Sequence, residues 1–200
     1  MSGVLHEFTT QVPEWRPRVK PIELANATPE QLEALQVTPS NTKVSDYVLV
    51  LANDVETLKV RSPLFNAIMY GRGGLSRAER ELGAVGASIV NRCIYCAAVH
   101  ASRHNQLTKD ETVIAKIFAD GENAEIEKRQ AAILSFAVRL SRAPSDANPE
   151  DMRRLRDAGL SDEEILDLIL SASLFGWANR LMHTLGDPVA RDDANGGSGR

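Results

Sequence analysis

The chain has 200 residues, 43% of them apolar and 25% charged, which is enough for one compact domain with its own core. Basic and acidic side chains number 23 and 27, and the net charge of −4 disfavours nucleic acid or an anionic membrane as a partner. The N-terminus lacks the features of a signal peptide, and the most apolar segment, residues 165–178, is short and interrupted by Asp167. We therefore expect a cytoplasmic protein, in which a permanent cross-link between two cysteines is disfavoured.

Three parts follow one another along the chain. Residues 1–26 are rich in proline and are predicted to form an extended N-terminal arm. Residues 27–188 are predicted to form a single helical domain, and residues 189–200 a disordered tail, because their composition is polar and glycine-rich. The expected fold class is all-α, a helical bundle.

Helix signals recur throughout this domain. A Ser or Thr followed three residues later by Glu or Gln, the pattern of a capping box, occurs at Thr28–Gln31, Ser76–Glu79, Thr108–Glu111 and Ser161–Glu164. Asn148-Pro149 marks another start, and Gly159 suits the left-handed position after a helix. Apolar spacing between these signals predicts helices over residues 29–36, 43–52, 54–70, 77–90, 93–107, 109–119, 124–141, 149–158 and 162–183. No segment alternates convincingly as a strand, residues 47–51 being the one short candidate.

The stretch RCIYCAAVH, residues 92–100, contains both cysteines of the chain. In a helix over residues 93–107, one face carries Cys93, Cys96, His100 and His104. The first turn of a helix favours a thiolate, and a CxxC pair placed there commonly contains one thiol with a lowered pKa. A nearby histidine can accept the thiol proton, and the second cysteine can close a disulfide on an oxidised sulfur. The pattern predicts a reactive thiol pair.

Two other interpretations of these residues stay open. Small buried cysteines and a buried histidine can simply be core residues. A structural zinc ion is disfavoured, because it needs four ligands and one helix spreads Cys93 and His104 about 16 Å apart. We expect His104 at the surface, with a supporting place beside the site as the alternative.

A glutamate in the preceding helix has no obvious structural task. Glu79 belongs to a capping box, whereas Glu81 shares its side of the helix with small or apolar residues, which predicts burial and therefore a partner. A solvated or surface-paired Glu81 is the alternative. An uninterrupted helix would leave Glu81 about 22 Å from Cys96. A functional link between them requires the chain to turn near residues 90–93.

The spacing Glu81-x11-Cys93-x2-Cys96-x3-His100 resembles the core motif of the alkylhydroperoxidase D (AhpD-like) family, within the carboxymuconolactone decarboxylase-like superfamily. The stretches PLFNAIMYGRGGLSRAERELGAVGASIVNRCIYCAAVH and GLSDEEILDLILSASLFGWANRLMHTLGD resemble its peroxidase-related subgroup, so the resemblance covers residues 45–187. It implies that residues 27–188 form an AhpD-like domain, with the core motif region at 62–120. It also implies homo-oligomers, often trimers or multiples of trimers.

The resemblance implies a hydroperoxide reductase that acts on a small-molecule hydroperoxide, without a metal or cofactor, and is reset by an external dithiol or protein reductant. Cys96 would be the peroxidatic thiol, Cys93 the resolving thiol and disulfide partner, and Glu81 with His100 the proton relay. Tyr95 departs from the histidine that several members carry between the cysteines. A phenol is not a base near neutral pH, so Tyr95 is expected to support the site.

Two rival functions are left open by the sequence. One is a carboxymuconolactone decarboxylase-like lyase, which needs an acid–base group but no thiol pair. The other is a non-enzymatic redox sensor whose cysteines report oxidation to a partner. On the last long helix, Arg180 could neutralise an acidic substrate, although an ion pair with a buried carboxylate is favoured.

Overall fold

The computed structural model describes residues 3–35, 39 and 43–191. The described chain contains α1 (Pro29–Ala34), α2 (Asp46–Leu51), α3 (Val55–Tyr70), α4 (Arg77–Val90), α5 (Ile94–Thr108), α6 (Thr112–Asp120), α7 (Lys128–Arg142), α8 (Pro149–Asp157), α9 (Asp162–Leu185), β1 (Glu14–Pro17) and β2 (Gly186–Val189). The helices agree with the predicted ones to within four residues at either end, and the all-α fold class is confirmed.

The helix starts follow the predicted capping chemistry with one exception. Reciprocal capping boxes are present at Thr28, Ser76 and Ser161, and the Asn148 side chain caps α8. The box predicted at Thr108–Glu111 is wrong, because α5 continues through Thr108 and the next helix begins only at residue 112. The Thr108 hydroxyl instead donates to the His104 carbonyl oxygen of its own helix at 2.9 Å.

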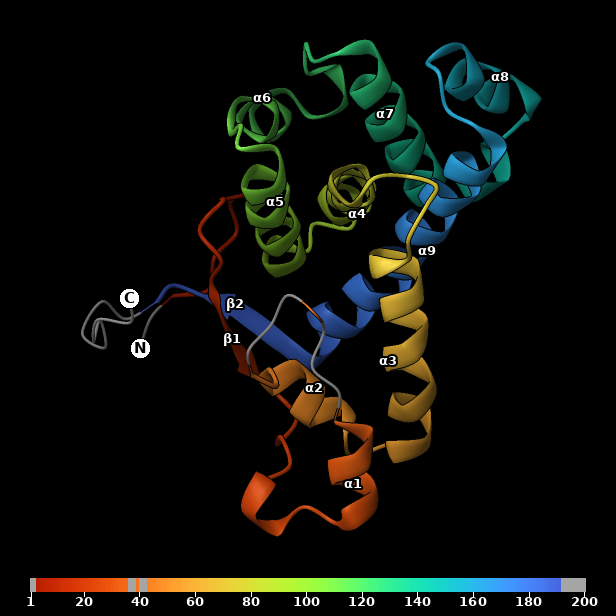
Figure 1. Cartoon of the computed structure of the whole chain (residues 1–200). Helices are drawn as coiled ribbons and strands as arrows, with labels where there is room; N and C mark the ends of the chain where they lie inside the picture. The colour runs from red at the N-terminus through yellow and green to blue at the C-terminus, as the bar shows by residue number, and fades with distance from the viewer. Residues whose placement is uncertain (1–2, 36–38, 40–42, 192–200) are drawn as a thin grey trace.

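Helix α4 lies at the centre of the bundle and packs against α5, α7 and α9 (Figure 1). Close approach depends on two glycines on α4. A Cβ atom at Gly86 would lie 2.8 Å from Cβ of Ala137 on α7, and one at Gly83 would lie 2.9 Å from the Leu168 side chain on α9. These distances are shorter than van der Waals contact, so the packing of α4 requires glycine at both positions.

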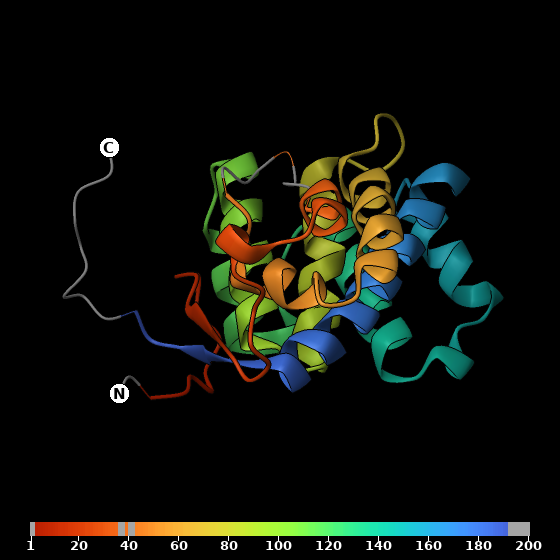
Figure 2. The same cartoon turned by 90° about the horizontal axis from the view of Figure 1, so that it is seen from below.

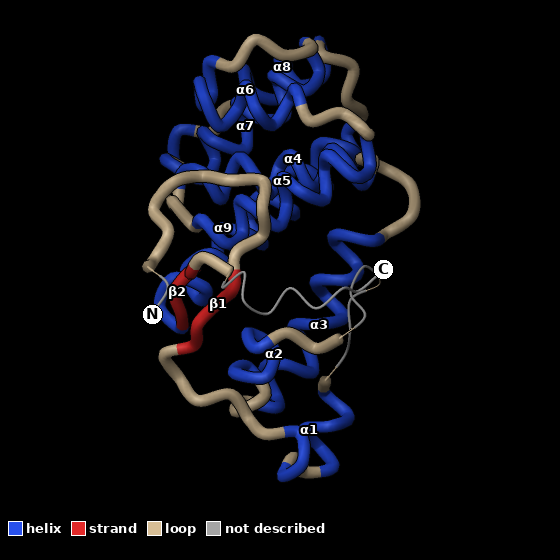
Figure 3. Tube along the Cα trace, turned by 90° about the vertical axis from the view of Figure 1, so that its left-hand side faces the viewer, coloured by secondary structure: helices blue, strands red, loops and turns tan. Residues whose placement is uncertain are grey.

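A two-stranded sheet was not expected. β1 and β2 pair antiparallel, with Pro17 opposite Gly186 (Figure 3). Each strand has four residues and contains a proline, so neither shows the alternation that identifies a strand in a sequence. The Trp15 ring packs on Gly186, where a Cβ would lie 2.4 Å from the ring. The strand candidate at residues 47–51 is helical, and the predicted tail lies outside the described residues from residue 192 onward.

Helix α9 is longer than the apolar pattern suggested. Its 24 residues are long and apolar enough to cross a membrane by length and composition alone, with a mean hydropathy of 1.2 over the most apolar window. Half of that window is buried inside the fold, and the helix carries a paired carboxylate at Asp167. Helix α9 therefore packs as a core helix of the bundle.

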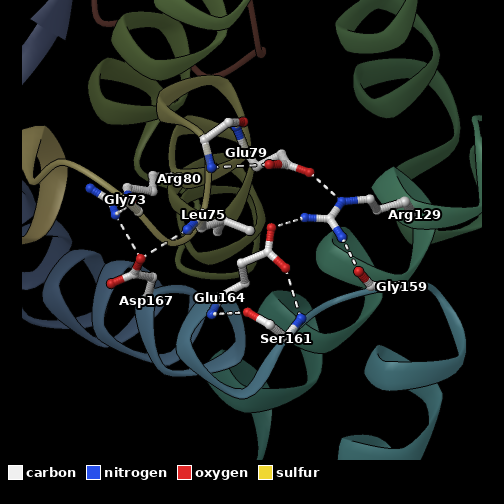
Figure 4. A network of polar contacts seen from close by, with 10 residues as sticks. Gly73, Leu75, Glu79, Arg80, Arg129, Gly159, Ser161, Glu164 and Asp167 are labelled. Atoms are coloured by element: carbon white, nitrogen blue, oxygen red, sulfur yellow. Dashed lines mark hydrogen bonds and ion pairs between the residues drawn. The ribbon is translucent and has the colours of Figure 1, made fainter.

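Ion pairs fasten the N-terminal end of α4 to two neighbouring helices (Figure 4). Arg129 on α7 donates to Glu79 at 2.6 Å and to Glu164 on α9 at 2.5 Å. Arg80 donates to Asp167 on α9 at 2.6 Å. The three helices are therefore joined by charge as well as by apolar contact.

The N-terminal elements cover one side of this bundle. Seen from below, α1, α2 and α3 lie in front of α4 and α5 (Figure 2). Residues from α2, α3, α4, α5 and α9 together line a cavity on this side. The predicted thiol helix forms part of its wall.

Candidate functional site

The chain turns sharply between α4 and α5, as a link between Glu81 and the cysteines requires. Arg92 has a left-handed backbone with φ of 50°, and the Cys93 amide donates to the Ser88 carbonyl oxygen at 3.0 Å. The turn lets α5 fold back along α4. The predicted reversal near residues 90–93 is confirmed.

Glu81 is buried and holds two cationic or ionisable partners. Its side chain is 1% exposed, and Oε2 lies 2.5 Å from Nδ1 of His100. Oε1 accepts from Nε of Arg77 at 2.9 Å and also from its Nη2. Burial by itself raises the pKa of Glu81, but His100 and Arg77 outweigh that effect and hold the pKa below its usual range. The predicted burial and partner are confirmed, and Glu81 is a carboxylate near neutral pH.

The His100 ring is fixed between that carboxylate and an aromatic side chain. It meets the Phe175 ring edge-on, with 4.0 Å between centroids. Since Nδ1 is engaged with Glu81, Nε2 is the nitrogen through which the ring can exchange a proton with the cavity. No hydrogen bond joins the ring to the Cys96 sulfur among the described residues. A proton must therefore cross the cavity to pass between them.

The two thiols are free and buried, and no disulfide joins them. Cys93 is the N-cap of α5, three residues before Cys96. The neighbouring Cys96 lowers the pKa of the Cys93 thiol and outweighs the opposite effect of burial. Sharing its proton with Cys93 and burial raise the pKa of Cys96. The lowered pKa predicted for one thiol thus belongs to Cys93.

A cavity of about 310 Å³ brings the site residues together. Cys96, His100 and Glu81 line it, whereas Cys93 is not among the lining residues. Half of the remaining lining residues are aromatic or basic: Tyr47, Phe65, Tyr70, Tyr95, Phe175, Arg61, Arg77 and Arg103. The cavity therefore offers one thiol, a carboxylate–imidazole pair and an electropositive, aromatic surround.

The two residues expected to support the site differ in position. Tyr95 lines the cavity, and burial raises its pKa, so it is an uncharged phenol. His104 is only 1% exposed, so the expected surface position is wrong. It is buried because α5 packs along α4, and burial lowers its pKa. Its Nδ1 has no hydrogen-bond partner among the described residues.

Three arginines differ from the sequence-based predictions: Arg77 and Arg61 were not predicted to belong to the site, and Arg180 was expected to form an ion pair. Arg77 holds Glu81, and its position four residues earlier on the same helix was the available signal. Arg61 lies in the cavity wall within the apolar stripe of α3, three residues after the buried Leu58, and that unusual place was its signal. Arg180 donates to the Gly176 carbonyl oxygen of its own helix and forms no ion pair with a described carboxylate, so the favoured pairing is wrong.

Comparisons with known proteins agree with this fold. The profile of the Carboxymuconolactone decarboxylase family matches residues 56–135. A structure of an uncharacterised peroxidase-related protein with an alkylhydroperoxidase AhpD core, from Ralstonia eutropha JMP134, is 29% identical with a TM-score of 0.74, over 86% of this chain and 90% of that one. A peroxidase-related protein from Silicibacter sp. TM1040 is 27% identical with a TM-score of 0.73, over 88% and 94%. The uncharacterised protein YdfG from Bacillus subtilis (strain 168) is 23% identical over 60% of this chain and 81% of its own.

Proposed function

Because the chain belongs to the AhpD-like and carboxymuconolactone decarboxylase-like superfamily, we propose that it is a thiol-dependent hydroperoxide reductase. One observation carries this proposal. A pair of free thiols lies at the start of α5, and its Cys96 member shares a cavity with the buried Glu81–His100 pair. An acid–base pair that needed no thiol would not account for two free cysteines at the start of α5, one of them in the cavity wall.

In the proposed reaction the thiol pair first loses one proton to His100, which Glu81 stabilises as an imidazolium. The pKa is lowered for Cys93 and raised for Cys96, so the proton that remains is first held by Cys96. Moving it to Cys93 presents a Cys96 thiolate to the cavity. Cys96 is then the peroxidatic residue because it, and not Cys93, lines the cavity.

The Cys96 thiolate attacks the distal oxygen of the hydroperoxide. An S–O bond forms, the O–O bond breaks, and the leaving alkoxide takes the proton of His100 to become an alcohol. Cys93 then attacks the sulfenic acid of Cys96, forms the S–S bond, and gives up its proton with the departing hydroxide as water. An external dithiol or protein reductant reduces the disulfide by thiol–disulfide exchange. The proposal includes a cytoplasmic location, where free thiols are kept reduced.

Anaerobic thiol titration after one equivalent of cumene hydroperoxide tests the roles of the two cysteines. We expect wild type to lose two thiols, Cys93→Ser to accumulate a sulfenic acid that a dimedone probe traps, and Cys96→Ser to react slowly. Equal reactivity of the two variants would remove the assignment. A trapped sulfenic acid in Cys96→Ser alone would reverse the roles, in line with the lowered pKa of Cys93.

A lyase of the carboxymuconolactone decarboxylase type is the second candidate, and the family profile together with the Glu81–His100 pair favours it. Such a reaction uses the acid–base pair and not the thiols. Replacing both cysteines by serine would then leave activity on a lactone acid largely intact and abolish peroxide turnover. A redox sensor differs from both, because it is oxidised once and does not turn over when dithiol is abundant.

A further inference from the structure

Arg61 on α3 is a buried cation without a counter-ion. Its side chain is 8% exposed and lines the cavity, yet the described residues offer it no hydrogen bond and no salt bridge, and its Nε is unpartnered. Its guanidinium carbon lies 4.6 Å from the centre of the Phe65 ring and 5.8 Å from that of Tyr47. Burial lowers the pKa of Arg61, because a buried site disfavours the charged form of the side chain.

A second unused donor lies next to it. The Tyr47 side chain on α2 is 8% exposed and lines the same cavity, and its hydroxyl has no hydrogen-bond partner among the described residues. Burial raises the pKa of Tyr47, so the hydroxyl keeps its proton and can donate. The Trp15 ring of the N-terminal arm packs against the Tyr47 ring in a T-shaped arrangement, with 5.7 Å between the ring centroids. Two donors from different helices therefore lie in the same part of the cavity wall.

Two other arginines with little exposure to solvent have acidic partners, unlike Arg61. Arg80 is buried too, but it donates to Asp167 and to the carbonyl oxygens of Gly71 and Gly73. Arg77 is held by Glu81. Glu81 is the carboxylate of the cavity wall, and its two oxygens are already occupied by Arg77 and His100. Among the described residues, the wall therefore has no carboxylate left for Arg61.

We propose that Arg61 and Tyr47 form a binding site for a carboxylate, so that the substrate is an organic hydroperoxide with a carboxylate at one end of an apolar or aromatic body. This inference rests on the proposed function and adds the substrate class. A guanidinium and a phenol hydroxyl can donate to the two oxygens of one carboxylate. The aromatic wall then covers the body of the substrate, and its peroxide end reaches Cys96. Binding supplies the missing counter-ion of Arg61.

Ligand binding tests the site without peroxide chemistry. The probes are 3-phenylpropionate and its amide, which differ only in the charged group, titrated calorimetrically into the reduced full-length protein. We expect the acid to bind more tightly than the amide. Arg61→Gln should weaken binding of the acid by roughly 10- to 100-fold and Tyr47→Phe by roughly 3- to 10-fold, with little change for the amide. Arg180→Gln removes the same charge from an exposed place outside the cavity and should match wild type.

Equal binding of acid and amide by wild type would overturn the proposal. So would equal weakening of both probes in Arg61→Gln, because Arg61 would then only shape the wall. Tyr47→Phe keeps the ring that packs on Trp15, so it decides the matter if thermal melting shows that Arg61→Gln does not fold. In that case, unchanged binding of the acid by Tyr47→Phe would count against the site.

Kinetics separate this proposal from the proposed reaction. The substrates are cumene hydroperoxide and its para-carboxylated derivative, and the readout is the ratio of their kcat/KM values. We expect Arg61→Gln to lower kcat/KM for the carboxylated substrate, relative to kcat/KM for cumene hydroperoxide, at least tenfold. An equal loss for both substrates would mean that Arg61 acts on the Cys96 thiol, and the carboxylate site would be wrong. Selective acid binding without any peroxide turnover would instead remove the proposed function and leave the site.

Discussion

Glu79 and Glu81 lie two residues apart on α4 and have different surroundings. Glu79 closes the capping box of its own helix and pairs with Arg129, at a partly exposed junction of α4, α7 and α9 (Figure 4). Glu81 is buried against His100 of the next helix and faces the cavity. Two residues along a helix turn the side chain by about 200°, so these carboxylates serve opposite faces.

The two carboxylates differ in whether a bonded partner can exchange a proton near neutral pH. Glu79 is bonded to groups that do not titrate near neutral pH, so its role is to hold helices together. Glu81 is bonded to an imidazole in a cavity with a thiol, where a proton can move. The same residue type is structural on one face and suited to chemistry on the other.

Replacing Glu81 by Gln should have the largest effect on activity. The amide cannot stabilise the imidazolium of His100, so we expect kcat/KM for cumene hydroperoxide to fall by roughly 10²- to 10⁴-fold. Glu79→Gln is the matched control and should stay within about threefold of wild type, since general acid–base catalysis does not involve it. Wild-type turnover by Glu81→Gln, measured in a coupled dithiol assay, would show that the relay is not used.

Arg77→Gln should have a smaller effect of the same kind. It removes the guanidinium that donates to Glu81, so the pKa of that carboxylate rises and His100 is held less firmly. We expect kcat/KM to fall about tenfold, with the acidic limb of the pH–rate profile moved to higher pH. The exposed Arg153→Gln on α8 is the control for lost charge. An unmoved acidic limb would argue against this positioning role.

Arg129→Ala tests the other side of the comparison. The variant loses the ion pairs to Glu79 and Glu164 and the hydrogen bond to the Gly159 carbonyl oxygen. Because the cluster is partly exposed to water, we expect the free energy of unfolding in urea to drop by only about 1–2 kcal/mol. Peroxide turnover should stay unchanged at 25 °C. A loss of turnover in protein that is still fully folded would blur the distinction between the two faces.

The pH dependence of stability should distinguish the two glutamates most finely. The pKa of Glu81 is lower in the folded than in the unfolded chain, so the unfolded chain binds more protons as the pH falls through the ordinary glutamate value of about 4.3. This contribution is complete above that value and is lost in more acidic solution. We therefore expect the melting temperatures of wild type and Glu81→Gln to converge as the pH falls below about 5. Glu79→Gln should converge less, and equal convergence would contradict the comparison.

Local signals in the sequence anticipated most of the fold. Capping residues and apolar spacing act over one or two helical turns. They therefore predicted the helices, whose formation depends on residues close in the sequence. The failure at Thr108 has the same origin, because a Thr–x–x–Glu pattern starts a helix only if the preceding helix has already ended. β1 and β2 could not be predicted from local signals, because their pairing joins distant parts of the chain.

The sequence by itself determined which groups could react, since the spacing of Cys93, Cys96 and His100 along one helix follows from helix geometry. Tertiary structure alone decided how they are charged and what surrounds them. The turn at Arg92 places Glu81 against His100, and the fold leaves Arg61 buried without a carboxylate. Burial and counter-ions come from side chains remote in sequence, and these set the pKa values and the shape of a cavity.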